Sequence, residues 1–358
     1  MRRFRCQACD QMLFFANVQC LGCARALGFL PDLCRISALE PAGGDAWSPL
    51  DPAAQGRLYR FCDNYAQHHV CNWMVPLDEN QSLCRACRHN ETIPDLSIEA
   101  NKGYWSRLEQ AKRRLFYGLI KLGLPLQTKH ENPEHGLAFE FLADPDPSFA
   151  ESSRVMTGHE GGLITLNVAE ADDAVRERRR LEMNELYRTV LGHFRHEIGH
   201  YYWERLINPS QQLYAFRELF GDERLAYDAA LQRHYQEGPP PDWQANFVSA
   251  YASSHPWEDW AESWAHYLHM VDTLETARDL HLQLDTASAK SSQVLSGDEP
   301  YRPSSFDAMI AAWLPLTEAV NCLNRSMGQA DTYPFVLSDT AVEKVRFVHQ
   351  VIGEATGH

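Results

Sequence analysis

Two histidines and a glutamate, arranged as His196-Glu197-Ile198-Gly199-His200, have a spacing that predicts metal chemistry. On a helix, residues four positions apart share a face, so both imidazoles can reach one metal ion. Zinc lowers the pKa of a bound water to about 7, and Glu197, displaced to one side, can take the proton of that water. The motif therefore predicts a catalytic zinc site with His196 and His200 as ligands and Glu197 as the general base.

A catalytic zinc site also needs a third protein ligand, while its fourth position stays open. The segment from His255 to His266 is the best source, because Pro256 favours a helix start and acidic residues suit the first turn. Glu258 and Glu262 are four residues apart and would share one face of that helix. From spacing alone, Glu258, Glu262 and His255 are open alternatives for the third ligand.

The open position calls for a hydrogen-bond donor that stabilises the negative charge developing on the substrate oxygen. Tyrosines and histidines near the two predicted ligand segments could serve, and the sequence does not choose among them. The candidates for this oxyanion stabiliser are Tyr251, His255 and His266, together with Tyr201 and Tyr202.

Four cysteines near the N-terminus form two close pairs, Cys6-x-x-Cys9 and Cys20-x-x-Cys23, separated by ten residues. Two such pairs, each on its own turn, can close the tetrahedral zinc site of a zinc ribbon. A disulfide or redox pair is the alternative, but a lone redox motif would not require a second pair. The spacing predicts a first structural zinc site.

A second set of cysteines is more widely spaced: Cys62, Cys71 and the pair Cys84-x-x-Cys87. One close pair and two single thiolates can also complete a tetrahedral site, which predicts a second structural zinc. Three histidines could each replace one cysteine in this site: His68, His69 and His89.

The cysteines are unevenly distributed, since nine of the ten lie between Cys6 and Cys87. A small cysteine-rich region cannot build a large core, so metal binding would supply part of its folding free energy. Cys34 and Cys322 have no partner at ligand spacing and are expected to be buried free thiols.

The formal net charge is -15, from 33 basic and 48 acidic residues, which repels a phosphate backbone. The first 100 residues hold nine Arg and no Lys against eleven acidic residues. The balance argues against nucleic acid as a partner and favours protein recognition or structural support by the ribbon region. No apolar run is long enough for a membrane span and no secretory leader is visible, so a cytoplasmic location with reduced cysteines is expected.

Apolar residues at three- to four-residue spacing predict several helices that would position these groups. The predicted helices cover residues 102–122, 173–206, 243–253, 257–278, 306–326 and 339–352. Strand-forming residues predict strands over 137–142 and 163–168, and residues 285–305 are predicted to be a loop. The histidine motif would then lie in the second helix and Glu258 in the fourth.

The whole chain resembles a bacterial family of zinc-binding metallopeptidases with an N-terminal zinc-ribbon domain. The resemblance rests on specific segments that span nearly the full length. They are Cys6/Cys9/Cys20/Cys23, Cys71-Asn72-Trp73 with Cys84-x-x-Cys87, Thr92-Ile93-Pro94-Asp95-Leu96, and the three stretches 193–203, 220–224 and 255–262.

The pattern Glu-x-x-Ala-Glu formed by Glu258 and Glu262 also resembles the second helix of thermolysin-like zinc peptidases, the gluzincins. In those enzymes a glutamate ligates zinc, and an acidic residue one turn later hydrogen-bonds a ligating histidine. The resemblance implies that Glu258 is the ligand and that Glu262 orients an imidazole. It further implies that an edge strand, here Leu163 to Val168, pairs with an extended substrate beside the cleft.

We therefore predict an α+β, mainly helical, zincin-like metallopeptidase domain with a small sheet over residues 99–358. A cysteine-rich zinc-ribbon domain with two zinc sites would precede it over residues 1–98. The expected function is hydrolysis of peptide bonds in a peptide or protein substrate, with one catalytic zinc and Glu197 as general base. The alternative is a catalytically silent zincin-fold binding protein that uses its zinc ribbons for protein recognition.

Overall fold

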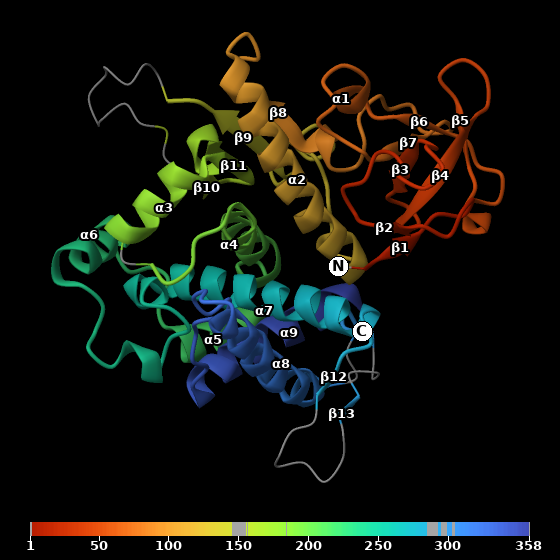
Figure 1. Ribbon diagram of the computed structural model, residues 1–358. Coiled ribbons are helices and arrows are strands. Elements are labelled where there is room, and N and C mark those ends of the chain that lie inside the picture. The colour runs from red at the N-terminus through yellow and green to blue at the C-terminus, as the bar shows by residue number, and fades with distance from the viewer. Residues whose placement is uncertain are drawn as a thin grey trace. The chain divides into compact units, whose positions relative to one another are not determined.

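The computed structural model describes residues 2–144, 155, 157–183, 185–284, 293–294, 299–302 and 305–357. The chain divides into two compact units: unit 1 contains residues 1–121, 126–157 and 165–171, and unit 2 contains 122–125, 158–164 and 172–358. Helices and strands are both present, which confirms the α+β class (Figure 1). The domain boundary between residues 98 and 99 remains a prediction, and unit 1 extends past it along a long helix.

Unit 1 begins with a β-hairpin and a five-stranded antiparallel sheet. The hairpin pairs β1 (Phe4–Arg5) with β2 (Met12–Leu13), and the sheet has the order β3-β4-β5-β6-β7. Its strands are β3 (Leu27–Leu30), β4 (Arg35–Pro41), β5 (Trp47–Pro49), β6 (Tyr59–Phe61) and β7 (Met74–Pro76). A parallel bridge between Phe29 and Trp73 brings the two ends of the sheet together.

A hydrophobic cluster holds this sheet, and one glycine shows how closely it packs. The cluster consists of Leu30, Leu39, Ala54, Tyr59 and Met74. A Cβ atom added to Gly28 would lie 2.4 Å from the sulfur of Met74, so only glycine fits there. Three short helical turns connect the strands: η1 (Pro52–Ala54), α1 (Asp63–Ala66) and η2 (Cys87–His89).

The rest of unit 1 contains the long helix α2 (Glu99–Leu122), which confirms the helix predicted over 102–122. Gly123, with φ of 78°, follows its last residue, as expected for a helix that ends in a left-handed residue. Strand β8 (Asn90–Thr92) pairs in parallel with β9 (Ala138–Leu142).

The predicted edge strand is β11 (Leu163–Asn167), and its position contradicts the expectation for residues 163–168. The strand order of this sheet is β10-β11-β9-β8, so β11 lies between two neighbours and its backbone groups are already paired. Among the strands that the structure describes, one end of this order is β10 (Gly158–Glu160), which belongs to unit 2 and contacts helix α4 (Val190–Tyr202) there. Alternating apolar residues mark a strand but do not reveal its neighbours.

Unit 2 is mainly helical, and the single helix predicted over 173–206 is interrupted. Helix α3 (Asp173–Glu182) ends well before α4 (Val190–Tyr202), which the Thr189 hydroxyl caps by accepting a hydrogen bond from the Gly192 N–H. A π-helical turn, η5 (Trp203–Ile207), continues α4. The segment between α3 and α4 contains no Gly or Pro. The sequence therefore carried no signal for a break, and one continuous helix was predicted.

Three of the remaining helices match the predictions: α7 (Pro256–Asp279), α8 (Phe306–Ser326) and α9 (Asp339–Thr356). Helices α5 (Gln212–Phe220) and α6 (Tyr227–Glu237) were not predicted. Residues 243–253 do not form the predicted helix but only the short turns η6 (Trp243–Ala245) and η7 (Tyr251–Ser254). The Ser249 hydroxyl accepts a hydrogen bond from the Ala252 N–H, and such a local bond competes with the backbone hydrogen bonds of a helix. Strand β12 (Gln283–Leu284) pairs with β13 (Gln293–Val294), which lies inside the predicted loop 285–305 and departs from that prediction. Most of the rest of this loop is outside the described residues.

Helices α4 and α7 pack closely in unit 2, and a glycine permits this approach (Figure 1). A Cβ atom added to Gly199 would lie 3.0 Å from the Cα atom of Ala261. The Trp260 indole N–H donates to the Gly199 carbonyl at 2.9 Å, and Trp264 stacks on Tyr202 with ring centroids 5.0 Å apart. This packing brings the histidine motif of α4 against the acidic residues of α7.

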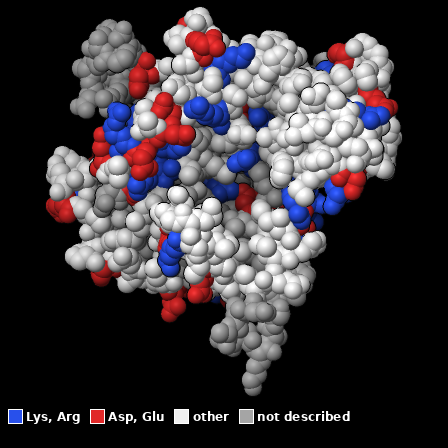
Figure 2. All heavy atoms as spheres, viewed as in Figure 1, with Lys and Arg blue, Asp and Glu red and all other residues white. Residues whose placement is uncertain are grey.

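The surface of α3 carries many charges of both signs. Figure 2 shows blue and red side chains interspersed over this helix. Arg176 pairs with Asp173, and Arg180 pairs with Glu177 at 2.7 Å, so the arginines of α3 have acidic neighbours within one helical turn. Across the described residues, no helix is long and apolar enough to cross a bilayer.

Candidate functional site

Three side chains of unit 2 direct one potential ligand atom each to a common point. The Nε2 atoms of His196 and His200 are 3.2 Å apart. The Oε2 atom of Glu258 lies 2.9 Å from the His196 Nε2 and 3.5 Å from the His200 Nε2. The Glu258 side chain is 1% exposed, so this carboxylate is buried against the two imidazoles.

This arrangement fits zinc. A tetrahedral ion with ligands at about 2.0–2.1 Å places neighbouring ligand atoms about 3.4 Å apart, close to the three separations observed here. Burying a carboxylate between two imidazoles is costly unless a proton or a cation compensates its charge. The three residues therefore form a candidate metal centre, with Glu258 supplying the third ligand atom.

Glu262 lies on the outer side of His196 and does not join the cluster. Its Oε1 atom is 2.8 Å from the His196 Nδ1, and its Oε2 atom accepts a hydrogen bond from the Ser249 hydroxyl at 2.6 Å. A carboxylate in this position fixes the tautomer and the ring orientation of a ligating histidine. The geometry therefore favours Glu258 over Glu262 as the ligand and suits Glu262 to orienting His196.

The second oxygen of Glu258 has a partner that sequence reasoning missed. The Tyr227 hydroxyl donates to the Glu258 Oε1 at 2.7 Å, although Tyr227 precedes Glu258 by 31 residues. No spacing rule connects a tyrosine at the start of one helix with a glutamate of another, so the sequence carried no signal for this contact. Ser249 was missed for the same reason.

Glu197 is buried beside the two histidines, with 8% of its surface exposed. Burial raises the pKa of the Glu197 carboxyl above its ordinary value, and the neighbouring imidazoles of His196 and His200 offset part of this rise. A carboxyl group whose pKa is raised toward neutrality is suited to accept a proton and return it.

The three principal candidates for the oxyanion stabiliser occupy different surroundings. Only Tyr251 lies against a ligand, with its ring centroid 5.8 Å from that of His196. His255 caps α7, because its Nδ1 accepts the Trp257 N–H at 3.1 Å, and its Nε2 is 3.2 Å from the Leu225 carbonyl. The His266 Nδ1 is 2.7 Å from the Tyr333 hydroxyl. The geometry favours Tyr251, and it argues against His255 as a metal ligand because both nitrogens of His255 have other partners.

Of the two further tyrosine candidates, Tyr202 is engaged elsewhere. The Tyr202 hydroxyl donates to the Pro125 carbonyl at 3.0 Å. The Tyr201 ring packs on Tyr202, with centroids 5.0 Å apart.

Two aromatic rings pack near the His200 imidazole. The Trp257 ring lies 4.0 Å from it, and the His159 ring of β10 is nearly parallel at 6.3 Å. His159 was missed because it belongs to a strand 37 positions before His196. The two rings restrict the orientation of the His200 imidazole.

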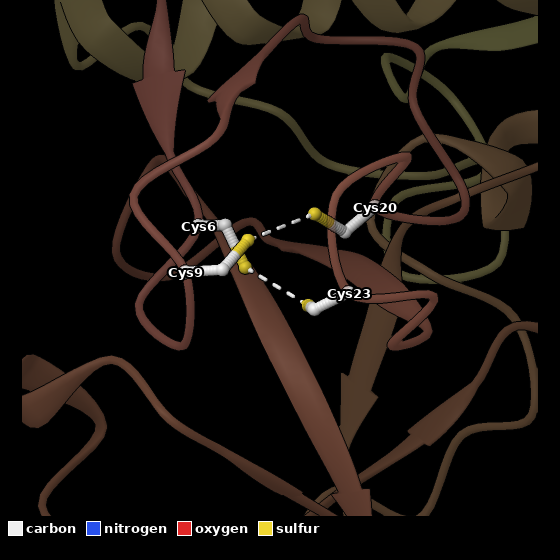
Figure 3. Close-up of side chains that lie close together, drawn as sticks. All are labelled: Cys6, Cys9, Cys20 and Cys23. Atoms are coloured by element: carbon white, nitrogen blue, oxygen red, sulfur yellow. Dashed lines mark hydrogen bonds between the residues drawn. The ribbon is translucent and has the colours of Figure 1, made fainter.

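In the first cysteine site, Cys6, Cys9, Cys20 and Cys23 turn their sulfur atoms toward one another (Figure 3). The sulfurs of Cys9 and Cys20 are 3.5 Å apart, and those of Cys6 and Cys23 are 3.7 Å apart. Zinc–sulfur bonds of about 2.3 Å place tetrahedral ligands about 3.8 Å apart, whereas a disulfide would need about 2.05 Å. The distances fit the predicted zinc ribbon.

In the second cysteine site, Cys62, Cys71, Cys84 and Cys87 converge without a histidine. The Cys71 sulfur is 3.7 Å from the sulfurs of both Cys84 and Cys87. All four residues are buried. The replacement by His89 does not occur, because its Nδ1 is 2.9 Å from the Leu137 carbonyl. Neither His68 nor His69 is part of the group.

The other two cysteines stand apart from both sites. Cys34 is half-buried, with its sulfur 3.7 Å from the Pro31 carbonyl, and Cys322 is exposed. The expectation that both are buried is therefore wrong, because Cys322 lies on a solvent-facing side of α8.

Comparisons with known proteins find zinc-related families over both parts of the chain. A family model described as "Putative zinc-binding metallo-peptidase" matches residues 101–351, and a zinc-ribbon domain model matches residues 3–98. Uncharacterized proteins of Mycobacterium bovis and of two Mycobacterium tuberculosis strains are each 45% identical over 357 residues. The matches cover 99% of this chain and 96% of each relative. No solved structure matches significantly.

Proposed function

The chain belongs to this family of zinc-binding metallopeptidases with a zinc-ribbon domain, and from that premise we propose that it hydrolyses peptide bonds at the His196–His200–Glu258 site. Two structural zinc ions would occupy the cysteine sites. The substrate would be a peptide or protein. The ten free cysteines support a reducing compartment such as the cytoplasm.

The proposal rests on one observation. Two imidazole nitrogens and one carboxylate oxygen meet at separations of 2.9 to 3.5 Å, with the carboxyl of Glu197 buried beside them. Three protein ligands from two helices, with one position left for water, characterise catalytic zinc sites, whereas structural sites have four protein ligands. The two cysteine sites of the chain each have four protein ligands. One chain therefore offers both a three-ligand site of the catalytic kind and four-ligand sites of the structural kind.

Each side chain would have a distinct role. When bound, zinc would act as a Lewis acid that polarises a carbonyl and acidifies water. Glu197 takes a proton from the attacking water and delivers it to the leaving amine. Glu262 holds the His196 ring through its Nδ1, and Tyr251 donates a hydrogen bond to the substrate oxygen as negative charge develops.

The metal content of the protein tests the site directly. Elemental analysis of the wild type should give three zinc ions per chain, and a His196→Ala/His200→Ala double variant should retain two. Two zinc ions in both samples, even after zinc is added, would contradict the assignment of the histidine site.

Turnover tests the general base. Unstructured peptides such as casein fragments should be cleaved by the wild type, and a chelator should abolish the cleavage. Glu197→Gln should keep all three zinc ions but lose about 10²- to 10⁴-fold in rate, because an amide cannot accept the proton. Unchanged turnover would exclude Glu197 as the base. Three zinc ions without any turnover in the wild type would favour the alternative of a catalytically silent binding protein.

A further inference from the structure

The two carboxylate oxygens of Glu258 have different partners, because the Tyr227 hydroxyl binds only one of them. It donates to Oε1 at 2.7 Å, whereas Oε2 faces the two imidazoles. A carboxylate can ligate a metal through one oxygen or through both, and it can rotate when its outer oxygen is unpaired. With Oε1 occupied by the phenol, Glu258 is left with a single oxygen for the metal and a fixed orientation.

The position of Tyr227 depends on the loop 221–226, which connects α5 to α6. His255 joins this loop to the start of α7: its Nδ1 caps α7 and its Nε2–H donates to the Leu225 carbonyl at 3.2 Å. The Tyr227 ring also packs edge-on against the His255 ring, with centroids 5.2 Å apart. One imidazole thus holds both the helix that carries Glu258 and the loop that presents Tyr227.

Two further contacts fix the beginning of the same loop. Gly221 has φ of 103°, and a Cβ atom added to it would lie 3.3 Å from the Pro256 ring. The Arg217 Nε donates to a Glu223 carboxylate oxygen at 2.9 Å. The loop is therefore held against the first turn of α7, and the segments 220–224 and 255–262 are in contact through it.

We propose that Tyr227 is a positioning residue that restricts Glu258 to single-oxygen ligation, and that His255 acts through the loop to hold Tyr227 in place. The inference rests on the proposed zinc site. A second oxygen of Glu258 on the metal would compete for the position that water and substrate need. Tyr227 thereby keeps that position open without touching the metal itself.

The experiment measures the zinc affinity of the histidine site by titration with a competing chelator. The relevant zinc ion is the one absent from the His196→Ala/His200→Ala variant. Removing an outer hydrogen bond to a metal ligand weakens binding by about 10- to 100-fold, so Tyr227→Phe should show a loss of that size. Tyr214→Phe is the control, because Tyr214 lies on α5 and is 75% exposed, and it should bind zinc as the wild type does.

A second variant tests the contribution of the loop. In His255→Asn, asparagine can still cap α7 but is too short to reach the Leu225 carbonyl as well. This variant should show a smaller loss of zinc affinity than Tyr227→Phe. Thermal unfolding and the zinc content of the cysteine sites should match the wild type in all variants, which separates a local effect from misfolding.

The outcomes are distinguishable from a failure of the proposed function. Wild-type affinity in Tyr227→Phe, or an equal loss in Tyr214→Phe, would overturn the inference while the zinc site itself stands. A wild type that never binds a third zinc would overturn the proposed function and this inference together. Both conclusions depend on zinc binding alone and not on peptide turnover.

Discussion

The two cysteine sites have the same four ligands but are built differently. In the first site Cys9 is exposed and Cys23 half-buried, whereas all four cysteines of the second site are buried. The ligands of the first site lie within 18 residues of one another, on two tight turns whose following residues, Asp10 and Ala24, have φ of 60° and 57°. Those of the second come from three separate places: Cys62, Cys71 and the pair Cys84/Cys87.

The second site also has buried charged neighbours, whereas the charged neighbour of the first site, Arg25 beside Cys23, is 41% exposed. Helix α2 places Glu109, Lys112 and Arg113 in the interior beside it, and the Glu109 Oε2 is 3.7 Å from the Cys87 sulfur. Burial opposes ionisation of Cys71, but its neighbouring thiols and the Arg113 guanidinium outweigh burial and lower its pKa well below the ordinary value. The comparison shows that a metal site on turns needs only local sequence, whereas a buried one needs compensating charge from another element.

Loss of one ligand should therefore affect the two sites unequally. We expect Cys71→Ser to lower the free energy of unfolding by several kcal/mol, because structural zinc contributes on the order of 10 kcal/mol to folding and this site lies in the interior. Cys9→Ser should cost much less, because its site is at the surface. Chemical denaturation together with zinc analysis measures both. Equal losses would show that burial does not distinguish the sites.

The compensating charge can be removed without touching a ligand. Arg113→Met should destabilise the protein by about 3–5 kcal/mol, because it leaves buried negative charge without its partner. Lys102→Met, at an exposed position of the same helix, is the control and should change stability by less than about 0.5 kcal/mol. An Arg113→Met protein as stable as the control would mean that the thiolates need no charge from α2.

Acid should destabilise unit 1 through the buried histidine His89. Burial lowers the pKa of His89 to about 4, although its hydrogen bond to Leu137 opposes this. The folded pKa lies below the unfolded one, so the stabilisation is present above about pH 6.5 and is lost toward pH 4, at about 1.4 kcal/mol per pH unit.

His89→Gln provides the control for this pH dependence, because glutamine can donate to the same carbonyl but does not titrate. Denaturation between pH 6.5 and 5 should show a shallower slope for the variant than for the wild type. Identical slopes would assign the acid sensitivity to the thiolates alone.

The smallest predicted effect concerns two alanines next to the ligands. Ala24 has φ of 57°, so Ala24→Gly should relieve left-handed strain and stabilise the first site by up to about 1 kcal/mol. Ala86 of the second site has φ of -88° and is fully buried. Ala86→Gly should therefore destabilise by about 1 kcal/mol. Thermal unfolding would reveal the opposite signs, and a shared sign would contradict the difference in backbone geometry.

The groups that could be predicted from the sequence are those whose spacing is local. Each Cys-x-x-Cys pair corresponds to one turn. The four-residue intervals of His196/His200 and Glu258/Glu262 each correspond to one helix face. The side chains that meet at each predicted metal site could therefore be named from the sequence. Tyr227, Ser249 and Arg113 reach their sites from other elements, and only three-dimensional packing reveals them. For the same reason the apolar pattern gave most helices but missed the break before Thr189 and the neighbours of β11.

The positions of the ligands along the chain also determine the order in which the metal sites are completed during synthesis. The first cysteine site is complete at residue 23 and the second at residue 87, whereas the histidine site waits for Glu258. At about 5–20 residues per second, a ribosome would make that last residue roughly 10 to 30 seconds after Cys87. Unit 1 has all of its residues only when residues 165–171 have left the ribosome. The proposed peptide-cleaving site is thus assembled after the N-terminal region of the same chain has had time to fold and become resistant to cleavage.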